Sequence, residues 1–331
     1  NVVVLDQAMT ILDGPRYPFS EQVLTGCTIV LGSGAKLATE GVSMRFAGPL
    51  VVQSATPTEV KLTRSFFAAP SVNFNLPGTG TAIEMAFSHL HATAGGLSFT
   101  MGDESKLTVM ARILNGPLEA MTAATTAQIR SGRKFAASFS QMRISAPQGI
   151  DIAMNGAEGL LTINTAWLTA AQGNIGISSP DAKGIVDLSS TNLVFGNMLS
   201  LRLAGSHSLL KLQQVGMSGF EGQIAPGGMV LEVGAGAAES GSIEASNVGF
   251  NYVASMNLRA SVNGQKGALK IQKSSLWSAG DMVMETGAQG LTEVVESYGA
   301  AATRLGLSTG AGGSCLANIN TIAAPVMQVC Q

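Results

Sequence analysis

The sequence is poor in charge, aromatic residues and histidine. Only 12% of its 331 residues are charged, 5% are aromatic and three are histidine, and the formal net charge is −2. So sparse and balanced a charge forms no basic patch, which argues against DNA or RNA as a partner. No apolar run approaches the ~18 to 20 residues that span a bilayer, so we expect no transmembrane segment. The 46% apolar content excludes a disordered chain, because disorder requires low hydrophobicity and high charge.

Cysteine is equally scarce, with three residues. Cys315 and Cys330 bracket the segment CLANINTIAAPVMQVC, and we predict that they form a structural disulfide; the alternative is two unrelated buried thiols. Cys27 would then be a small buried side chain. A disulfide favours an exported protein, and the sequence starts at Asn1, as after signal-peptide removal or trimming of a longer chain. We therefore expect an extracellular or cell-surface location.

What the sequence has instead is an internal repeat. LTINTAWLTAAQGN at Leu161 and LKIQKSSLWSAGDM at Leu269 share one pattern, with apolar residues at the first, third and eighth positions. The second position is mostly polar, which predicts a strand with one buried face. The pattern recurs about every 25 residues. Its nine copies start at Val60, Ile83, Leu107, Phe135, Leu161, Val186, Leu210, Ile243 and Leu269.

A second short strand precedes most copies, as in SVNFN at Ser71 and LSFTM at Leu97. Strands this short cannot enclose a core within one repeat, so successive turns must stack about 4.8 Å apart. Parallel crossovers are right-handed in nearly all proteins. The sequence therefore predicts an all-β fold, a right-handed parallel β-helix (solenoid) of about nine or more coils.

The second position of the repeat carries charges that alternate in sign where turns would stack. Opposite charges on neighbouring strands contribute about 0.2–1 kcal/mol each. A solvated ladder that sets the register of the turns is the favoured interpretation, and a binding strip is the alternative. The charged members of this predicted ladder are Lys61, Glu84, Asp187, Lys211, Glu244 and Lys270.

We divide the chain into three parts. Residues 1–59 are expected to form a strand-rich N-terminal cap with the first irregular coils, and residues 60–290 the β-helix. Residues 291–331 are expected to form a C-terminal capping helix and a disulfide-closed tail, because apolar residues from Leu291 onward fall at helical spacing. Two longer intervals between copies, near 116–128 and 219–241, are interpreted as loop insertions, a place where binding residues often lie.

The N-terminal stretch NVVVLDQAMTIL shows no obvious cap chemistry. An exposed strand edge invites pairing with another chain. The stretch is therefore a candidate assembly strand that adds to another molecule, with pairing inside its own chain as the alternative. The residues of this candidate strand are Val2, Val3, Val4 and Leu5.

Residues that carry chemistry are few and scattered. His89 and His91 stand two apart and could share a metal, with Glu84 as the nearest further ligand, but no column supplies a convincing ligand set, so no metal or cofactor is predicted. No two of the seven Asp are adjacent. Trp167 and Trp277 each precede the third apolar column, so they are candidates to face outward and contact a glycan, or simply to cover neighbouring side chains.

The repeat over roughly residues 60–290 resembles the right-handed parallel β-helix superfamily. That superfamily includes pectate-lyase-like enzymes, phage tailspikes and bacterial surface adhesins of the filamentous-haemagglutinin kind. The enzymes among them usually carry clustered acids on one face, as calcium ligands or for general acid–base chemistry. The resemblance implies fold far more than function.

Low charge, a long regular solenoid and no acidic cluster favour the adhesin-like end of this superfamily. We therefore expect a non-enzymatic structural protein, a bacterial surface-fibre or adhesin subunit. It would associate with itself head to tail or by strand exchange, with surface glycans as a further partner. The alternative is a polysaccharide-binding or polysaccharide-degrading β-helix protein.

Overall fold

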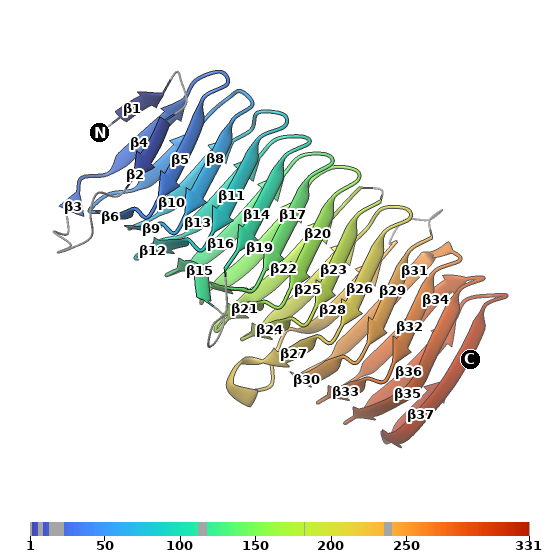
Figure 1. Cartoon of the computed structure of the whole chain (residues 1–331). Helices are drawn as coiled ribbons and strands as arrows, with labels where there is room; N and C mark the ends of the chain where they lie inside the picture. The colour runs from blue at the N-terminus through green and yellow to red at the C-terminus, as the bar shows by residue number, and fades with distance from the viewer. Residues whose placement is uncertain are drawn as a thin grey trace.

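The computed structural model describes residues 2–5, 9–12, 23–111, 118–181, 183–234 and 240–330. Within these residues every regular element is a β-strand, apart from one 3-10 turn, η1 at Phe220–Gly222. The strands build a parallel β-solenoid of about 12 turns, stacked along one axis from the N-terminal to the C-terminal end (Figure 1). The predicted all-β solenoid is confirmed.

Most turns contribute one strand to each of three rows, and every pairing within a row is parallel. Row A is a sheet of 14 strands. In chain order they are β1 (Val2–Leu5), β4 (Cys27–Leu31), β7 (Leu50–Gln53), β10 (Val72–Leu76), β13 (Leu97–Met101), β16 (Thr126–Ser131), β19 (Gly149–Met154), β22 (Asn174–Ser179), β25 (Met198–Leu203), β28 (Gly228–Val233), β31 (Met256–Gln265), β34 (Met282–Ala288), β36 (Arg304–Thr309) and β38 (Val326–Val329).

Rows B and C form the other two sides of the solenoid, and they merge in the long strands β35 (Leu291–Ala301) and β37 (Ser314–Ala323). The other strands of row B are β2 (Met9–Leu12), β5 (Lys36–Glu40), β8 (Glu59–Thr63), β11 (Ala82–Ala86), β14 (Lys106–Met110), β17 (Ala136–Ser140), β20 (Leu160–Asn164), β23 (Ile185–Ser189), β26 (Leu209–Gln213), β29 (Ser242–Ser246) and β32 (Ala268–Gln272). Those of row C are β3 (Val23–Leu24), β6 (Ser43–Phe46), β9 (Phe66–Ala69), β12 (His89–Ala92), β15 (Leu118–Ala123), β18 (Met142–Ser145), β21 (Trp167–Ala170), β24 (Asn192–Phe195), β27 (Gly216–Gly219), β30 (Gly249–Val253) and β33 (Ser275–Ser278).

The core fills the space between the three rows. Along β10, buried and exposed residues alternate, because successive side chains of a strand point to opposite faces. Stacking in register turns these inward positions into continuous apolar columns; Phe74 lies on Phe99 with ring centroids 5.0 Å apart. One such column of row A, here called the Cys27 column, consists of Cys27, Leu50, Val72, Leu97, Ala127, Ile150, Ile175, Leu199, Met229, Met256, Met282, Leu305 and Met327.

Single residues with positive φ turn the chain at the corners between rows. Glu104 and Lys134 do so between rows A and B, and Thr165 and Asn247 between rows B and C. The amide of each donates to a carbonyl of the next turn, as Glu104 N does to Arg133 O at 2.7 Å. The corners therefore extend the ladder of hydrogen bonds and stack polar side chains in columns on the outside.

The predicted capping helix is wrong, because residues 291–301 form strand β35. Leu291 pairs with Ala268 of row B, and Tyr298 pairs with Ser275 of row C. Glu296 turns the corner between the two rows with a φ of 49°. That one extra residue shifts the inward positions from Thr292 and Val294 to the odd-numbered residues that follow. Most of the apolar residues at helical spacing, such as Leu291, Val295 and Tyr298, therefore lie at outward positions.

The described strands of residues 1–59 continue the three rows. β2 pairs with β5, and β5 pairs with β8, in the same parallel register as later turns.

The predicted copy that starts at Phe135 is two residues out of register, because Ala137 and not Phe135 pairs with Leu107 and Leu161. The segments interpreted as insertions near 116–128 and 219–241 contain row strands β15, β16 and β28.

Candidate functional site

The predicted charge ladder lies on the outer face of row B. Lys61 Nζ is 3.5 Å from Glu84 Oε1. Lys211 Nζ is 3.7 Å from Asp187 Oδ2. Glu244 lies in register between Lys211 and Lys270. All these side chains remain partly exposed, so the ladder biases the register at about 0.2–1 kcal/mol for each opposite-charge pair.

Sequence reasoning missed the next member of the ladder. Glu293 of β35 pairs with Lys270, so the alternation of charge continues for one more turn. The helix prediction for this segment hid the match. Glu293 and Val294 repeat the charged and second apolar positions of Lys270 and Ile271, but Thr292 replaces the apolar residue that opens the earlier copies.

A hollow of about 330 Å³ opens on this face near the C-terminal half of the ladder. On its outer face Ser246 is a short residue between Gln213 and Gln272 of the neighbouring turns, whereas Ala245 points into the core. The hollow presents two ammonium groups, one carboxylate and two amides to solvent, a set that can hydrogen-bond to polyhydroxylated or charged ligands. Its lining residues are Lys211, Leu212, Gln213, Glu244, Ala245, Ser246, Lys270 and Gln272.

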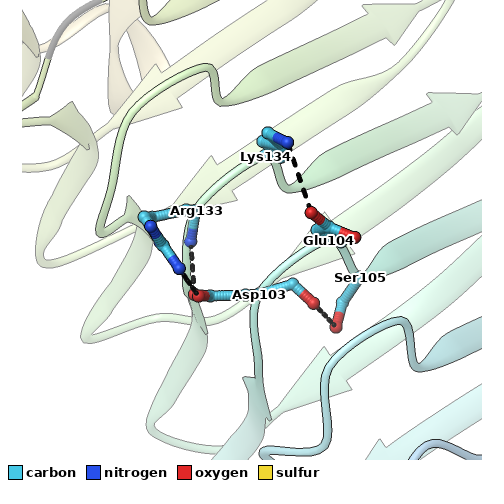
Figure 2. A network of polar contacts seen from close by, with 5 residues as sticks. All are labelled: Asp103, Glu104, Ser105, Arg133 and Lys134. Atoms are coloured by element: carbon cyan, nitrogen blue, oxygen red, sulfur yellow. Dashed lines mark hydrogen bonds and ion pairs between the residues drawn. The ribbon is translucent and has the colours of Figure 1, made fainter.

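A second charged network, not foreseen from the sequence, lies at the corner between rows A and B (Figure 2). Asp103 accepts hydrogen bonds from Arg133 Nε at 3.0 Å, from its Nη2 at 2.8 Å and from its backbone amide at 2.8 Å. The backbone amide and then the guanidinium of Arg133 lower the pKa of the Asp103 carboxyl. Beside this pair, Lys134 Nζ donates to Glu104 Oε1 at 3.3 Å.

The sequence carries a recognisable signal for this network. An acidic dipeptide, Asp103–Glu104, stands in one turn and a basic dipeptide, Arg133–Lys134, in the next. Their separation is longer than the usual repeat, which obscured the match. Like Asp103, Ser105 takes part in the local bonding, since its hydroxyl donates to the Asp103 carbonyl at 3.3 Å. The network therefore joins the corners of two successive turns by hydrogen bonds and ion pairs.

The two neighbouring histidines share the outer face of β12 in row C. The rings of His89 and His91 are stacked with centroids 5.7 Å apart, and His89 Nε2 forms a 2.9 Å hydrogen bond with Thr122 Oγ1. Glu84 lies in row B, where it pairs with Lys61. Among the described residues no group of three or more His, Cys, Asp or Glu is arranged to hold a metal ion.

The two tryptophans face outward from row C, as the repeat pattern indicated. Trp167 is 41% exposed, and the Arg143 guanidinium lies over its ring, 4.9 Å from the centroid. Trp277 packs beside the exposed Tyr252 with centroids 5.7 Å apart. Both rings thus cover neighbouring side chains and still present aromatic surface to solvent.

The two ends of the solenoid hold the remaining predicted residues. A disulfide joins Cys315 and Cys330, with Cα atoms 5.3 Å apart. Residues Val2 to Leu5 form β1, which pairs in parallel with β4 of the same chain. Cys27 is a free thiol at the first position of the Cys27 column and is partly exposed rather than buried.

No family model, curated protein or solved structure matches this chain. The described residues include no helix with the length and apolar character needed to cross a membrane.

Proposed function

We propose that the chain is a non-enzymatic extracellular structural protein, a surface-fibre or adhesin subunit that associates with itself through the ends of its solenoid. The observation that carries the proposal is the uninterrupted Cys27 column, which runs from Cys27 in the first turns to Met327 in the last. A core that continues unbroken from turn to turn, with only neighbouring turns in contact, makes a rod. Such a rod suits a load-bearing or spacing role.

The charged side chains support the same role. Ion pairs join successive turns along the outside, as between Lys36 and Glu59 at 2.7 Å and between Arg259 and Glu285 at 2.6 Å. These pairs favour one register of each turn on the next, because a shifted strand would separate the opposite charges. The Cys315–Cys330 disulfide fits an oxidising compartment and supports an extracellular or cell-surface location. We also propose right-handed winding, the sense that about 98% of parallel crossovers adopt.

Imaging of the purified protein tests this proposal. About 12 turns at a rise of ~4.8 Å give a rod of roughly 58 Å. Negative-stain micrographs and sedimentation velocity over a range of concentrations should show rods whose lengths are multiples of that unit. Particles that stay single and short at every concentration would contradict self-association.

A second candidate function is binding or degradation of a polysaccharide. It is favoured by the polar hollow beside Lys211 and Lys270 and by the outward rings of Trp167 and Trp277. Glycan-array binding that is lost in Trp167→Ala or Trp277→Ala would support a binding role. Release of new reducing or unsaturated ends from a panel of acidic and neutral glycans, with and without calcium, would support degradation.

A further inference from the structure

Row C differs from the other two rows in its charge. Its strands β21, β24, β27, β30 and β33 follow one another along one side of the solenoid (Figure 1), and they contain no Asp, Glu, Lys, Arg or His. Over the same turns row A carries opposite charges in register, as in the pair of Arg202 and Glu232 at 3.7 Å. Row B carries the ladder that contains Asp187 and Lys211. A ligand on row C therefore meets a neutral face, in contrast to the other two.

The same face gathers the tryptophan and tyrosine residues. Of the two Trp and three Tyr in the chain, four project outward from row C, and Tyr17 lies outside the described residues. Three of the four, Tyr252, Trp277 and Tyr298, lie on successive turns and are here called the aromatic platform. Tyr252 and Tyr298 are 45% and 55% exposed. Tyr298 is in register with Ser275, two residues before Trp277, so the rings of Tyr298 and Trp277 hold diagonal positions within reach of each other.

Carboxamide groups line the face between Trp167 and the aromatic platform. Gly216 and Gly249 are neighbours in one outward column, and they leave room for the amides beside them. Asn192 Oδ1 lies 2.5 Å from the place that a Cβ of Gly216 would take. Asn251 Nδ2 lies 3.4 Å from the corresponding place at Gly249. Within the described residues neither carboxamide has a hydrogen-bond partner, so both remain available to a ligand.

We propose that this face of row C, from Trp167 to Tyr298, binds a neutral polysaccharide that lies along the axis of the solenoid. The inference rests on the second candidate function, polysaccharide binding, and assigns its site and the charge class of its ligand. Aromatic rings pack against the apolar C–H faces of sugar rings, while carboxamides and hydroxyls exchange hydrogen bonds with sugar hydroxyls. An acidic glycan would bring carboxylates onto strands that hold no cation to pair with them, which costs desolvation free energy. Arg143, beside Trp167 at the start of the face, is already stacked on that ring.

The shape of the face favours an extended sugar chain over a protein. Five steps of ~4.8 Å separate the turn of Trp167 from that of Tyr298, about 24 Å in all. The core of a protein–protein interface is apolar, but Val194 is the only aliphatic residue larger than alanine at the outward positions of these five strands. The backbone ladder already orders the strip, so binding costs little conformational entropy. One outward column in continuous register consists of Trp167, Asn192, Gly216, Gly249, Ser275 and Tyr298.

Substitution of the aromatic platform tests the site. The probes are soluble β-glucan, mannan, galactan and dextran, with hyaluronan as the acidic member of the panel. In Trp277→Ala/Tyr298→Ala, the affinity for the neutral glycan bound by wild type should fall at least about tenfold in isothermal titration calorimetry, because the stacking surface is lost. Both side chains point outward, and circular dichroism checks that the variant is folded. Tyr298→Ser, at the most exposed ring, should weaken binding in the same direction and serves if the double variant is unstable.

The matched control is Lys211→Ala/Lys270→Ala, which removes two side chains from the polar hollow on row B. Its affinity for the same glycan should equal that of wild type. Binding by wild type should also be the same at low salt and at about 1 M salt, because a neutral ligand makes no ion pair that salt would screen.

The outcomes separate the site from the function. A neutral glycan bound equally by wild type and by Trp277→Ala/Tyr298→Ala, or lost in the row B control, would overturn the site and leave polysaccharide binding standing. Preference for hyaluronan that disappears at about 1 M salt would overturn the neutral class. Binding to no member of the panel would overturn both this inference and the second candidate function. Capture of a protein by this face, with no glycan bound, would replace the sugar chain by a protein partner.

Discussion

At the scale of single residues, Asp103 shows how a corner of the solenoid is fixed. Glu104, the residue after it, turns the chain with a φ of 55°, a conformation that costs a non-glycine residue roughly 1–2 kcal/mol. The hydrogen bonds that Asp103 accepts from Arg133 offset part of that strain by tying the corner to the next turn.

The lowered pKa of Asp103 predicts how this contact depends on pH. A carboxyl whose pKa is depressed by folding stabilises the native state above its ordinary pKa, and the contribution is lost as pH falls through the folded pKa. Asp103→Asn should therefore unfold at lower urea concentration than wild type at pH 7, and the difference should shrink below about pH 4. Urea titrations followed by circular dichroism measure both. Asp181→Asn controls for the loss of one exposed negative charge, and a difference that persists unchanged in acid would contradict this account.

Lys211 provides the corresponding prediction for the ladder of row B. Lys211→Glu would place three acidic side chains in succession with Asp187 and Glu244. We expect a loss of about 1 kcal/mol in the free energy of unfolding, most of it recovered at about 1 M salt, because exposed charges are screened. Lys211→Gln, which removes the charge without reversing it, should cost less. Equal losses in both variants at both salt concentrations would show that packing, and not charge, is responsible.

At the scale of elements, the strands of the middle turns follow from sequence and the corners do not. Alternation of apolar and polar residues around Leu161, Val186 and Leu210 identifies row B directly, because each position points either into the core or out of it. A single corner residue such as Glu296 leaves no distinct signal, since almost any polar residue occupies it. It reverses the phase of the alternation, so β35 shows no single continuous apolar–polar pattern that would identify it as a strand.

The candidate sites also differ in whether the sequence predicts their contacts. Pairs within one column, such as Asp187 and Lys211, could be read from the repeat alone. The contact of Asp103 with Arg133 joins turns of unequal length, so its register depends on the loop between them.

The disulfide belongs to this scale, because it acts on the last pair of strands. Closing a loop of about 15 residues contributes roughly 3 kcal/mol by limiting the unfolded chain. In Cys315→Ser/Cys330→Ser, amides of β37 and β38 should exchange with solvent markedly faster, while those of β22 and β25 are unchanged. Hydrogen–deuterium exchange with mass spectrometry resolves the two regions. Faster exchange throughout the solenoid would contradict a local role, and Cys27→Ser is the control for loss of a thiol.

At the scale of the whole molecule, the solenoid is a one-dimensional stack in which each turn contacts only its neighbours. Its stability is then approximately the sum of turn stabilities and interfaces between turns. A turn in the middle has two interfaces, and a turn near an end has weaker support on one side. The same substitution should therefore lower the free energy of unfolding by different amounts in a middle turn and in a turn near one end of the same column.

Leu201 and Leu307 allow that comparison, because they share a column of row A and are 0% and 1% exposed. Leu201→Ala should lower the free energy of unfolding by about 2–5 kcal/mol, since a central cavity weakens the turns on both sides of it. Leu307→Ala removes the same atoms, but the last turns can open locally without unfolding the rest. We expect a smaller shift in the main urea transition, accompanied by fast amide exchange confined to β36 and β38. Identical shifts for the two variants would mean that the molecule unfolds as one cooperative unit, and the description of the fold as a stack of semi-independent turns would be wrong.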